Sequence, residues 1–188
     1  MRSPHLGSPS APYELASARP SAATKVVFLL LGLCTAAWAP LIPFAKARLG
    51  VDPGVLGLIL LCGGAGSIAT MALAGALAAR LGCRAVILAA SLALLVALPA
   101  LAVGRTAPAM IAALLVFGGA AGAIDVAANI HGIAVEKAAG RPMMSGFHGF
   151  YSFGGIAGAA GVASLMSAGL TPLPAVLAVD GVGLGLLL

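Results

Sequence analysis

The sequence predicts an all-α membrane protein, a bundle of about six transmembrane helices. Two observations carry this prediction. Of the 188 residues, 61% are hydrophobic and 8% are charged, whereas an average soluble domain has roughly 25% charged residues. The mean hydropathy is +1.12, and the apolar residues gather in runs separated by short segments that hold most of the lysines and arginines. Runs of about 20 apolar residues are long enough to cross a bilayer.

The amino-terminal segment is expected to be a disordered cytoplasmic tail over residues 1–24, because it is rich in Ser, Pro and Ala and lacks a hydrophobic period. Lys25 then opens the first span, 26–45. A cleavable signal peptide is the rival interpretation, because Ala37-Trp38-Ala39 imitates a cleavage site. The apolar run continues past that site through two prolines, which favours a retained helix that kinks near its end.

The later spans begin and end at recognisable signals. Asp52 followed by Pro53 is typical of a helix start, an N-cap acid with proline in the first turn. The last run is shorter than a full span, so we expect the chain to end inside a helix, as a fragment or a truncated product of a longer protein. Together the predicted spans form one helical bundle over residues 25–188, with limits at 26–45, 55–78, 85–103, 108–131, 147–168 and 173–188.

Basic residues in the short loops predict the orientation. The inner side of a membrane protein carries the excess of Lys and Arg in such loops. With the amino terminus in the cytoplasm, the larger group lies inside and the smaller group outside. The inner group is Arg2, Arg19, Lys25, Arg80, Arg84, Lys137 and Arg141, and the outer group is Lys46, Arg48 and Arg105.

Several function classes are disfavoured by the same residues. The net charge of +5 is distributed as a topology signal, without a basic stripe interleaved with aromatics, so we expect no nucleic-acid partner. The cysteines have no metal-ligand spacing, and we expect no metal and no cofactor. Glycines in the second span follow no predicted strand, which favours helix packing over a phosphate-binding loop.

An acid lies in the middle of the fourth span. Gly118, Gly122, Asp125 and Asn129 follow at helical steps, which puts them on one stripe. A charged residue at mid-membrane costs about 2.5–3.5 kcal/mol on insertion scales, so Asp125 is expected to face the bundle interior with a partner. It is our candidate for proton coupling; a structural acid bonded to a neighbouring helix is the alternative. Asn129 either contacts a solute or joins helices.

The fifth span carries a second polar stripe, on which His148 and Ser152 are followed by glycines. Because the loop between the two spans is short, we expect them to lie close together and antiparallel, with both stripes facing a common interior. Histidine is the residue type best suited to exchange protons at physiological pH, so His148 is a second proton-coupling candidate, although an interfacial histidine fits as well. Trp38, Tyr151 and Ser152 are further candidates for lining a substrate cavity, and Trp38 also fits an interfacial aromatic.

Two further features concern acids inside the spans. Asp180 in the last span is a further intramembrane acid. An intramembrane enzyme could use Asp125 with His148, but no nucleophile or metal-ligand motif stands at a suitable spacing. We therefore expect a protein that is not an enzyme.

The loop between the second and third spans resembles the signature loop of the major facilitator superfamily. It reads Gly75-Ala-Leu-Ala-Ala-Arg80-Leu-Gly82-Cys-Arg84. The residues that match the family pattern are Gly75, Leu77, Arg80, Gly82 and Arg84, whereas Cys83 stands where the family often has a basic residue. Ala79 stands where the family has an acid that helps to latch the two halves of the transporter, and it lacks the carboxylate for that contact. A plain hairpin that obeys the positive-inside rule is the alternative interpretation.

A second resemblance extends over the fourth and fifth spans. This region is similar to bacterial permeases of the same superfamily, particularly those like fucose permease. The residues that carry the resemblance are Asp125 to Asn129, Val135-Glu136-Lys137, Gly140-Arg141-Pro142, Phe147-His148-Gly149 and Ser152 to Gly155, and the segment Trp38 to Pro43 also fits.

The resemblance covers the amino-terminal half of a twelve-span family member. It implies half of a major facilitator fold in the bacterial inner membrane, and a partner in the form of a carboxy-terminal half. It also implies secondary active transport of a small solute, with a sugar or similar polar metabolite as the candidate, coupled to protons. Two alternatives stay open: a truncated, non-transporting half or membrane scaffold, and a drug or metabolite efflux protein of the same superfamily.

Overall fold

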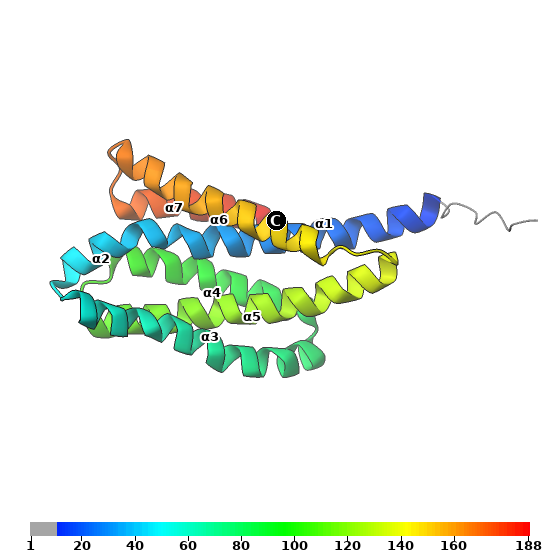
Figure 1. Cartoon of the computed structure of the whole chain (residues 1–188), viewed down its shortest axis with the longest axis horizontal. Coiled ribbons are helices and arrows are strands. Elements are labelled where there is room, and N and C mark those ends of the chain that lie inside the picture. The colour runs from blue at the N-terminus through cyan, green and yellow to red at the C-terminus, as the bar shows by residue number, and fades with distance from the viewer. Residues whose placement is uncertain (1–10) are drawn as a thin grey trace, which may run out of the picture.

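The structure is a computed structural model that describes residues 11–188, with side chains from residue 19 onward. Within that range every regular element is a helix, and the prediction of an all-α membrane bundle is confirmed. Figure 1 shows long helices lying side by side. The elements are α1 (Ala11–Ala37), the 3-10 turn η1 (Ala39–Leu41), α2 (Ile42–Leu49), α3 (Pro53–Leu81), α4 (Cys83–Val103), α5 (Ala107–Ala139), α6 (Met144–Ser167) and α7 (Pro172–Leu187).

The helices are suited to a lipid environment. Five segments are long and apolar enough to cross a membrane, namely Arg19–Leu49, Pro53–Leu81, Cys83–Val103, Ala107–Ala139 and Met144–Ser167, and α7 is a shorter apolar helix. Large apolar side chains are exposed along them, for example Leu61 and Ile68 on α3, which are 67% and 73% exposed. Apolar surface of this extent requires contact with lipid or protein. The chain is a multi-pass membrane protein.

The first helix differs from its expected limits at both ends. It begins at Ala11, so residues 11–24 of the expected disordered tail are helical, while residues 1–10 lie outside the described part of the chain. The many alanines of this segment favour a helix. At its other end α1 stops at Ala37, and η1 separates it from α2. Pro40 lies in η1 and has no N–H to continue the helical hydrogen bonds, which explains the break.

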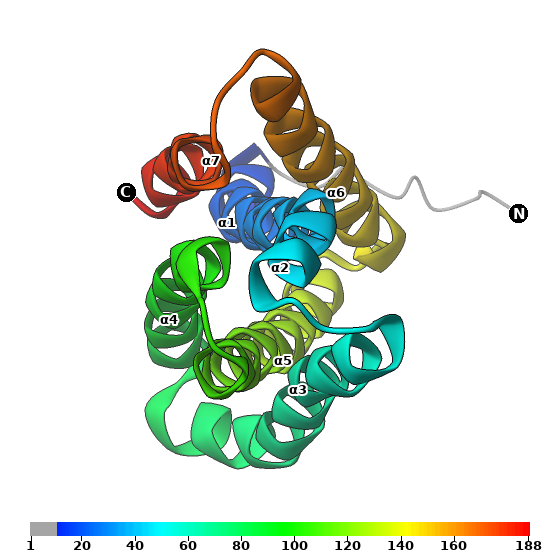
Figure 2. The ribbon, with the colours of Figure 1, turned by 90° about the vertical axis from the view of Figure 1, so that its left-hand side faces the viewer.

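The helices are arranged as two related groups of three. The most extensive pairings are α3 with α5 and α1 with α6, and each third helix, α4 or α7, packs beside them. If α1 is exchanged with α5, α3 with α6 and α4 with α7, the pair of α1 and α6 becomes the pair of α5 and α3. Figure 1 shows that α1 and α5 run in opposite directions, and Figure 2 shows the pairs end-on. The bundle therefore consists of two three-helix units in inverted orientation.

Glycines bring the paired backbones into contact. A Cβ atom on Gly118 of α5 would overlap the carbonyl oxygen of Gly63 in α3, and one on Gly158 of α6 would overlap the carbonyl oxygen of Leu33 in α1. The expected close packing of the fourth and fifth spans on each other was wrong, because α5 and α6 share few contacts. Their glycine stripes pack instead on α3 and α1, since a short loop joins helix ends without fixing which faces meet.

The predicted cap before the second span is confirmed. The Oδ1 atom of Asp52 accepts hydrogen bonds from the backbone N–H groups of Gly54 at 2.7 Å and Val55 at 3.1 Å. The N–H groups of Val55 and then Gly54 hold the pKa of the Asp52 carboxyl below its usual value. The ionised side chain thus fixes the start of α3 outside the apolar spans.

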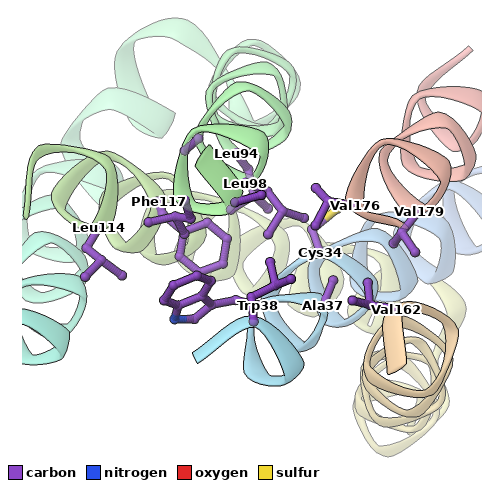
Figure 3. Packing of buried hydrophobic residues seen from close by; sticks show 14 of the residues in the cluster. Cys34, Ala37, Trp38, Leu94, Leu98, Leu114, Phe117, Val162, Val176 and Val179 are labelled. Carbon is purple, nitrogen blue, oxygen red and sulfur yellow. The ribbon is translucent and has the colours of Figure 1, made fainter. Parts of the chain in front are cut away.

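The main core lies where α1, α4, α5 and α7 meet, with Val162 of α6 at its edge. Figure 3 shows Trp38 beside Phe117, and Cys34 near Val176. Trp38 is only 7% exposed. This core holds the two three-helix units together through side-chain packing.

The span count makes a testable prediction about topology. In a protein whose native cysteines are replaced by alanine, single cysteines at Asp52 and Arg141 should react with an impermeant maleimide from opposite sides of the membrane. The reason is that an odd number of predicted spans separates the two positions and basic residues cluster at the Arg141 end. Labelling of intact cells and of inverted vesicles measures this. Reaction of both positions from one side would contradict the span count.

Candidate functional site

A small cavity lies between the two paired sets of helices. Its volume is about 190 Å³, and residues from α1, α3, α5 and α6 line it. These are the four helices of the two close pairs, so the cavity lies where the inverted units meet. The lining residues are Leu31, Thr35, Ser67, Met71, Ala121, Gly122, Asp125 and Tyr151.

Asp125 is the acid of this cavity and is half-buried. The Asn129 side-chain amide, one turn later, donates a hydrogen bond to Asp125 Oδ1 at 3.1 Å and another to the Asp125 backbone oxygen at 2.8 Å. Asn129 does not itself line the cavity, so it acts on the cavity through Asp125. The hydrogen-bond donor to the Asp125 carboxylate thus lies on the same helix. The carboxylate oxygens can accept further hydrogen bonds from groups in the cavity.

Hydroxyl groups supply the remaining polar lining. Thr35 Oγ1 donates to the backbone oxygen of Leu31 at 2.6 Å, and a hydroxyl that donates in this way retains lone pairs to accept a hydrogen bond. Ser67 and Tyr151 each add a hydroxyl from α3 and α6. With one carboxylate, several hydroxyls and apolar walls, the cavity can hold water or a small polar solute.

The structure separates the other predicted candidates from this cavity. Tyr151 lines it, as expected, but Trp38, His148 and Ser152 do not. Trp38 packs in the main core, and Ser152 is exposed. His148 is also exposed, and its ring meets Phe28 of α1 edge-on at 5.1 Å between centroids. The assignment of Trp38 and Ser152 to a substrate cavity, and of His148 to proton coupling, therefore stays a prediction that this cavity does not support.

Thr35, Ser67 and Met71 were missed by sequence reasoning. These residue types do not by themselves indicate a cavity. Ser and Thr inside membrane helices commonly hydrogen-bond to the preceding turn, and methionine is an ordinary packing residue. A helical-step count in α3 from Gly63 through Ser67 would have put Ser67 on the glycine face. Only the pairing of α3 with α5 shows that this face meets Gly122.

The four residues of the signature-like loop lie at one end of the bundle. Gly82 joins α3 to α4 with a φ of 83°, a value that favours glycine, and its N–H bonds to the Ala78 oxygen at 2.9 Å. Arg80 and Arg84 on either side are exposed, and Gly75 lies in α3. None of the four lines the cavity. The loop therefore makes a tight turn that presents two guanidinium groups at this end, which we call the Arg84 end.

Asp180 on α7 is a second acid within the bundle. It is only 8% exposed, and neither carboxylate oxygen has a hydrogen-bond partner among the described residues. Gly183, one turn later, packs against Cys34 and Leu30 of α1. A buried polar group without a partner costs about 1–3 kcal/mol. Burial of the Asp180 carboxylate is therefore expected to cost stability where α7 packs on α1.

This burial predicts the effect of Asp180→Val. The substitution should raise the thermal stability of the purified protein by up to about 1–3 kcal/mol, because it removes the unpartnered carboxylate at similar volume. Thermal unfolding in detergent, with Asp180→Asn as the control that keeps a polar group, measures the change. A clear loss of stability in Asp180→Val would show that the carboxylate is bonded after all.

We next consider whether side chains are grouped as metal ligands. Among the described residues, no group of three or more His, Cys, Asp and Glu side chains is placed to hold a metal ion. The polar chemistry of the cavity is that of a carboxylate and hydroxyls.

Comparison with known proteins gives two curated relatives. The chain is 54% identical over 155 residues to an uncharacterized MFS-type transporter of Yersinia pestis, an alignment that covers 82% of this chain and 40% of the relative. It is 36% identical over 121 residues to an uncharacterized transporter of Sinorhizobium fredii, covering 64% of this chain and 32% of that protein. The chain thus spans less than half the length of these relatives. No family model and no solved structure matches it.

Proposed function

We propose, from relatives whose names support membership in the major facilitator superfamily, that this chain is the amino-terminal half of a secondary active transporter. Its substrate would be a small polar solute, with a sugar as the first candidate, and its driving ion would be the proton. Within the superfamily we propose the fucose permease-like branch, which the motifs of the fourth and fifth spans resemble. The protein would lie in the bacterial inner membrane with a cytoplasmic amino terminus.

The inverted three-helix units support this proposal. Transporter halves of this superfamily are built from inverted repeats of three helices, and solute sites lie where repeats meet near the middle of the membrane. In the present bundle the unit of α1, α3 and α4 is related to the unit of α5, α6 and α7 by such an inversion.

The single observation that carries the proposal is the cavity that contains Asp125. It combines an intramembrane carboxylate with the hydroxyls of Thr35, Ser67 and Tyr151 in a space of about 190 Å³. An acid in the membrane is costly and is commonly retained for ion or substrate handling. Hydroxyls that donate and accept fit a solute rich in hydroxyl groups.

In the mechanism that this arrangement supports, Asp125 exchanges a proton with one side of the membrane and then with the other. Asn129 holds the carboxylate by its hydrogen bond at 3.1 Å. The solute would bond to the hydroxyls of the same cavity, so that its binding and the protonation of Asp125 influence each other. A carboxy-terminal half would close the cavity from the opposite side, and rocking of the halves would alternate its access.

Uptake by proteoliposomes tests the proposal. The complete transporter, reconstituted with an inward proton gradient, is assayed with a panel of radiolabelled hexoses, deoxyhexoses, amino acids and organic acids. We expect accumulation of one class, abolished by a protonophore. The 188-residue chain reconstituted alone serves as a control for the alternative of a non-transporting half, and extrusion from preloaded vesicles would identify an efflux protein. No transport of any solute by the complete protein would contradict the proposal.

A further inference from the structure

A second and larger cavity lies at the Arg84 end of the bundle. Its volume is about 600 Å³, and it lies between α1, α4 and α7, with His131 of α5 also contributing to its lining. It shares no lining residue with the cavity that contains Asp125. Most of the lining is apolar, including Val26 and Leu30 of α1, Leu88 of α4 and the last leucines of α7. We call this cavity the α4–α7 groove.

The charged side chains that line the groove are all of one sign. Arg19 of α1 and Arg84 of α4 line it, both side chains are exposed, and no acidic side chain is present among its described lining residues. Arg19 stands at the beginning of the apolar segment Arg19–Leu49, about two turns into α1, and Arg84 stands at the beginning of α4. The groove therefore combines a cationic end with apolar walls.

The groove is also placed where lipid can reach it. Leu88 of α4 lines the groove and is 38% exposed, and Leu92 and Val96, one and two turns later on the same face, are 54% and 73% exposed. Surfaces of this kind on membrane-spanning helices face acyl chains. Figure 2 shows α4 and α7 on the same side of the bundle. An acyl chain that lies along this exposed face of α4 therefore adjoins the groove at Leu88.

We propose that the α4–α7 groove binds one anionic phospholipid. Its phosphate would lie between the guanidinium groups of Arg19 and Arg84, and an acyl chain would lie along Leu88 and the leucines of α7. Guanidinium groups bind phosphate oxygens through paired charge-assisted hydrogen bonds. Basic pockets between transmembrane helices at a cytoplasmic surface are suited to anionic headgroups. A free phosphate ion would leave the apolar walls uncovered. The proposal does not depend on transport.

Native mass spectrometry of the purified chain in detergent tests this inference. The probes are dioleoyl-phosphatidylglycerol and, with the same chains but no net charge, dioleoyl-phosphatidylcholine. We expect one phosphatidylglycerol to be retained in preference to phosphatidylcholine. Arg84→Gln and Arg19→Gln should each weaken its binding about fivefold, as expected for a basic residue beside an anionic lipid. The matched control is Arg80→Gln, an exposed arginine of the same loop that does not line the groove.

A second variant tests the apolar part of the groove. Leu88→Trp adds bulk to a wall residue that is 38% exposed, so it should lower retention of phosphatidylglycerol without changing charge. Glycerol 3-phosphate, which has the headgroup charge but no acyl chains, should not compete at concentrations at which the lipid saturates. Equal retention of both lipids, equal effects of Arg80→Gln and Arg84→Gln, effective competition by glycerol 3-phosphate, or no retained lipid would each overturn the inference. Thermal unfolding of every variant confirms that it is folded.

Discussion

Asp125→Asn in the complete transporter is expected to abolish proton-driven accumulation while leaving exchange of solute intact. Asparagine keeps the size of the side chain and can still accept the hydrogen bond from Asn129 that Asp125 Oδ1 accepts at 3.1 Å. It cannot bind and release a proton. A gradient of one pH unit supplies about 1.4 kcal/mol per proton, enough for about tenfold accumulation at one proton per solute. The variant should stop at a ratio of about one.

Proteoliposome uptake with and without an imposed pH gradient measures this, and counterflow exchange in the same vesicles shows whether the solute site survives. Asp52→Asn is the matched control, because this acid lies outside the spans and asparagine is an equally good N-cap. Its accumulation should equal that of the wild type. Normal accumulation by correctly inserted Asp125→Asn would make Asp125 a structural residue and direct attention to His148 and Asp180.

Gly118→Ala and Gly158→Ala should each destabilise the bundle by about 1–3 kcal/mol, the usual cost of overpacking. The added Cβ would overlap the backbone carbonyl of Gly63 in one case and of Leu33 in the other. A backbone atom cannot rotate away as a side chain can, so the helices must separate. For a protein of this size the loss corresponds to a fall in melting temperature of roughly 2–12 °C.

The control for these variants is Gly64→Ala on α3, where an added Cβ would meet no described atom within 4 Å. It should be neutral or slightly stabilising, because alanine is a better helix former than glycine. Thermal unfolding in detergent and the yield of folded protein measure all three. Equal melting temperatures for Gly64→Ala and Gly118→Ala would show that the α3 and α5 backbones are not in contact as described.

The elements that could be predicted best from the sequence are those whose conformation is set by the lipid environment. Long apolar runs must satisfy their backbone hydrogen bonds internally, so they become helices whatever their packing partners are. The helix start at Asp52 and the turn at Gly82 could also be predicted from local chemistry. An N-cap and a turn with positive φ depend only on neighbouring residues. Residues 11–24 were expected to be disordered because they are rich in Ser, Pro and Ala and lack a hydrophobic period, yet they belong to α1, with Pro20 inside the helix.

Which helices pack against each other could not be predicted from the sequence. Glycine stripes on α5 and α6 indicate close packing but do not say on which helix, and proximity along the chain favoured the wrong partner. Trp38 shows the same limit: its position near prolines fits an interface or a cavity, and only the tertiary structure puts it beside Phe117 in the core. Asp125 was found because an intramembrane acid is rare, whereas Thr35 and Ser67 have no such distinction.

The measurement that tests the central claim most directly is protection of the cavity by solute. In the complete transporter without native cysteines, Ala121→Cys places a thiol in the lining of the Asp125 cavity, and Thr171→Cys places one in the exposed loop before α7. Alkylation by N-ethylmaleimide is followed with and without the solute that the uptake panel identifies. Solute at saturation should slow the reaction at position 121 at least several-fold and leave position 171 unchanged. Alkylation at position 121 that is indifferent to a transported solute would contradict the assignment of this cavity as the solute site.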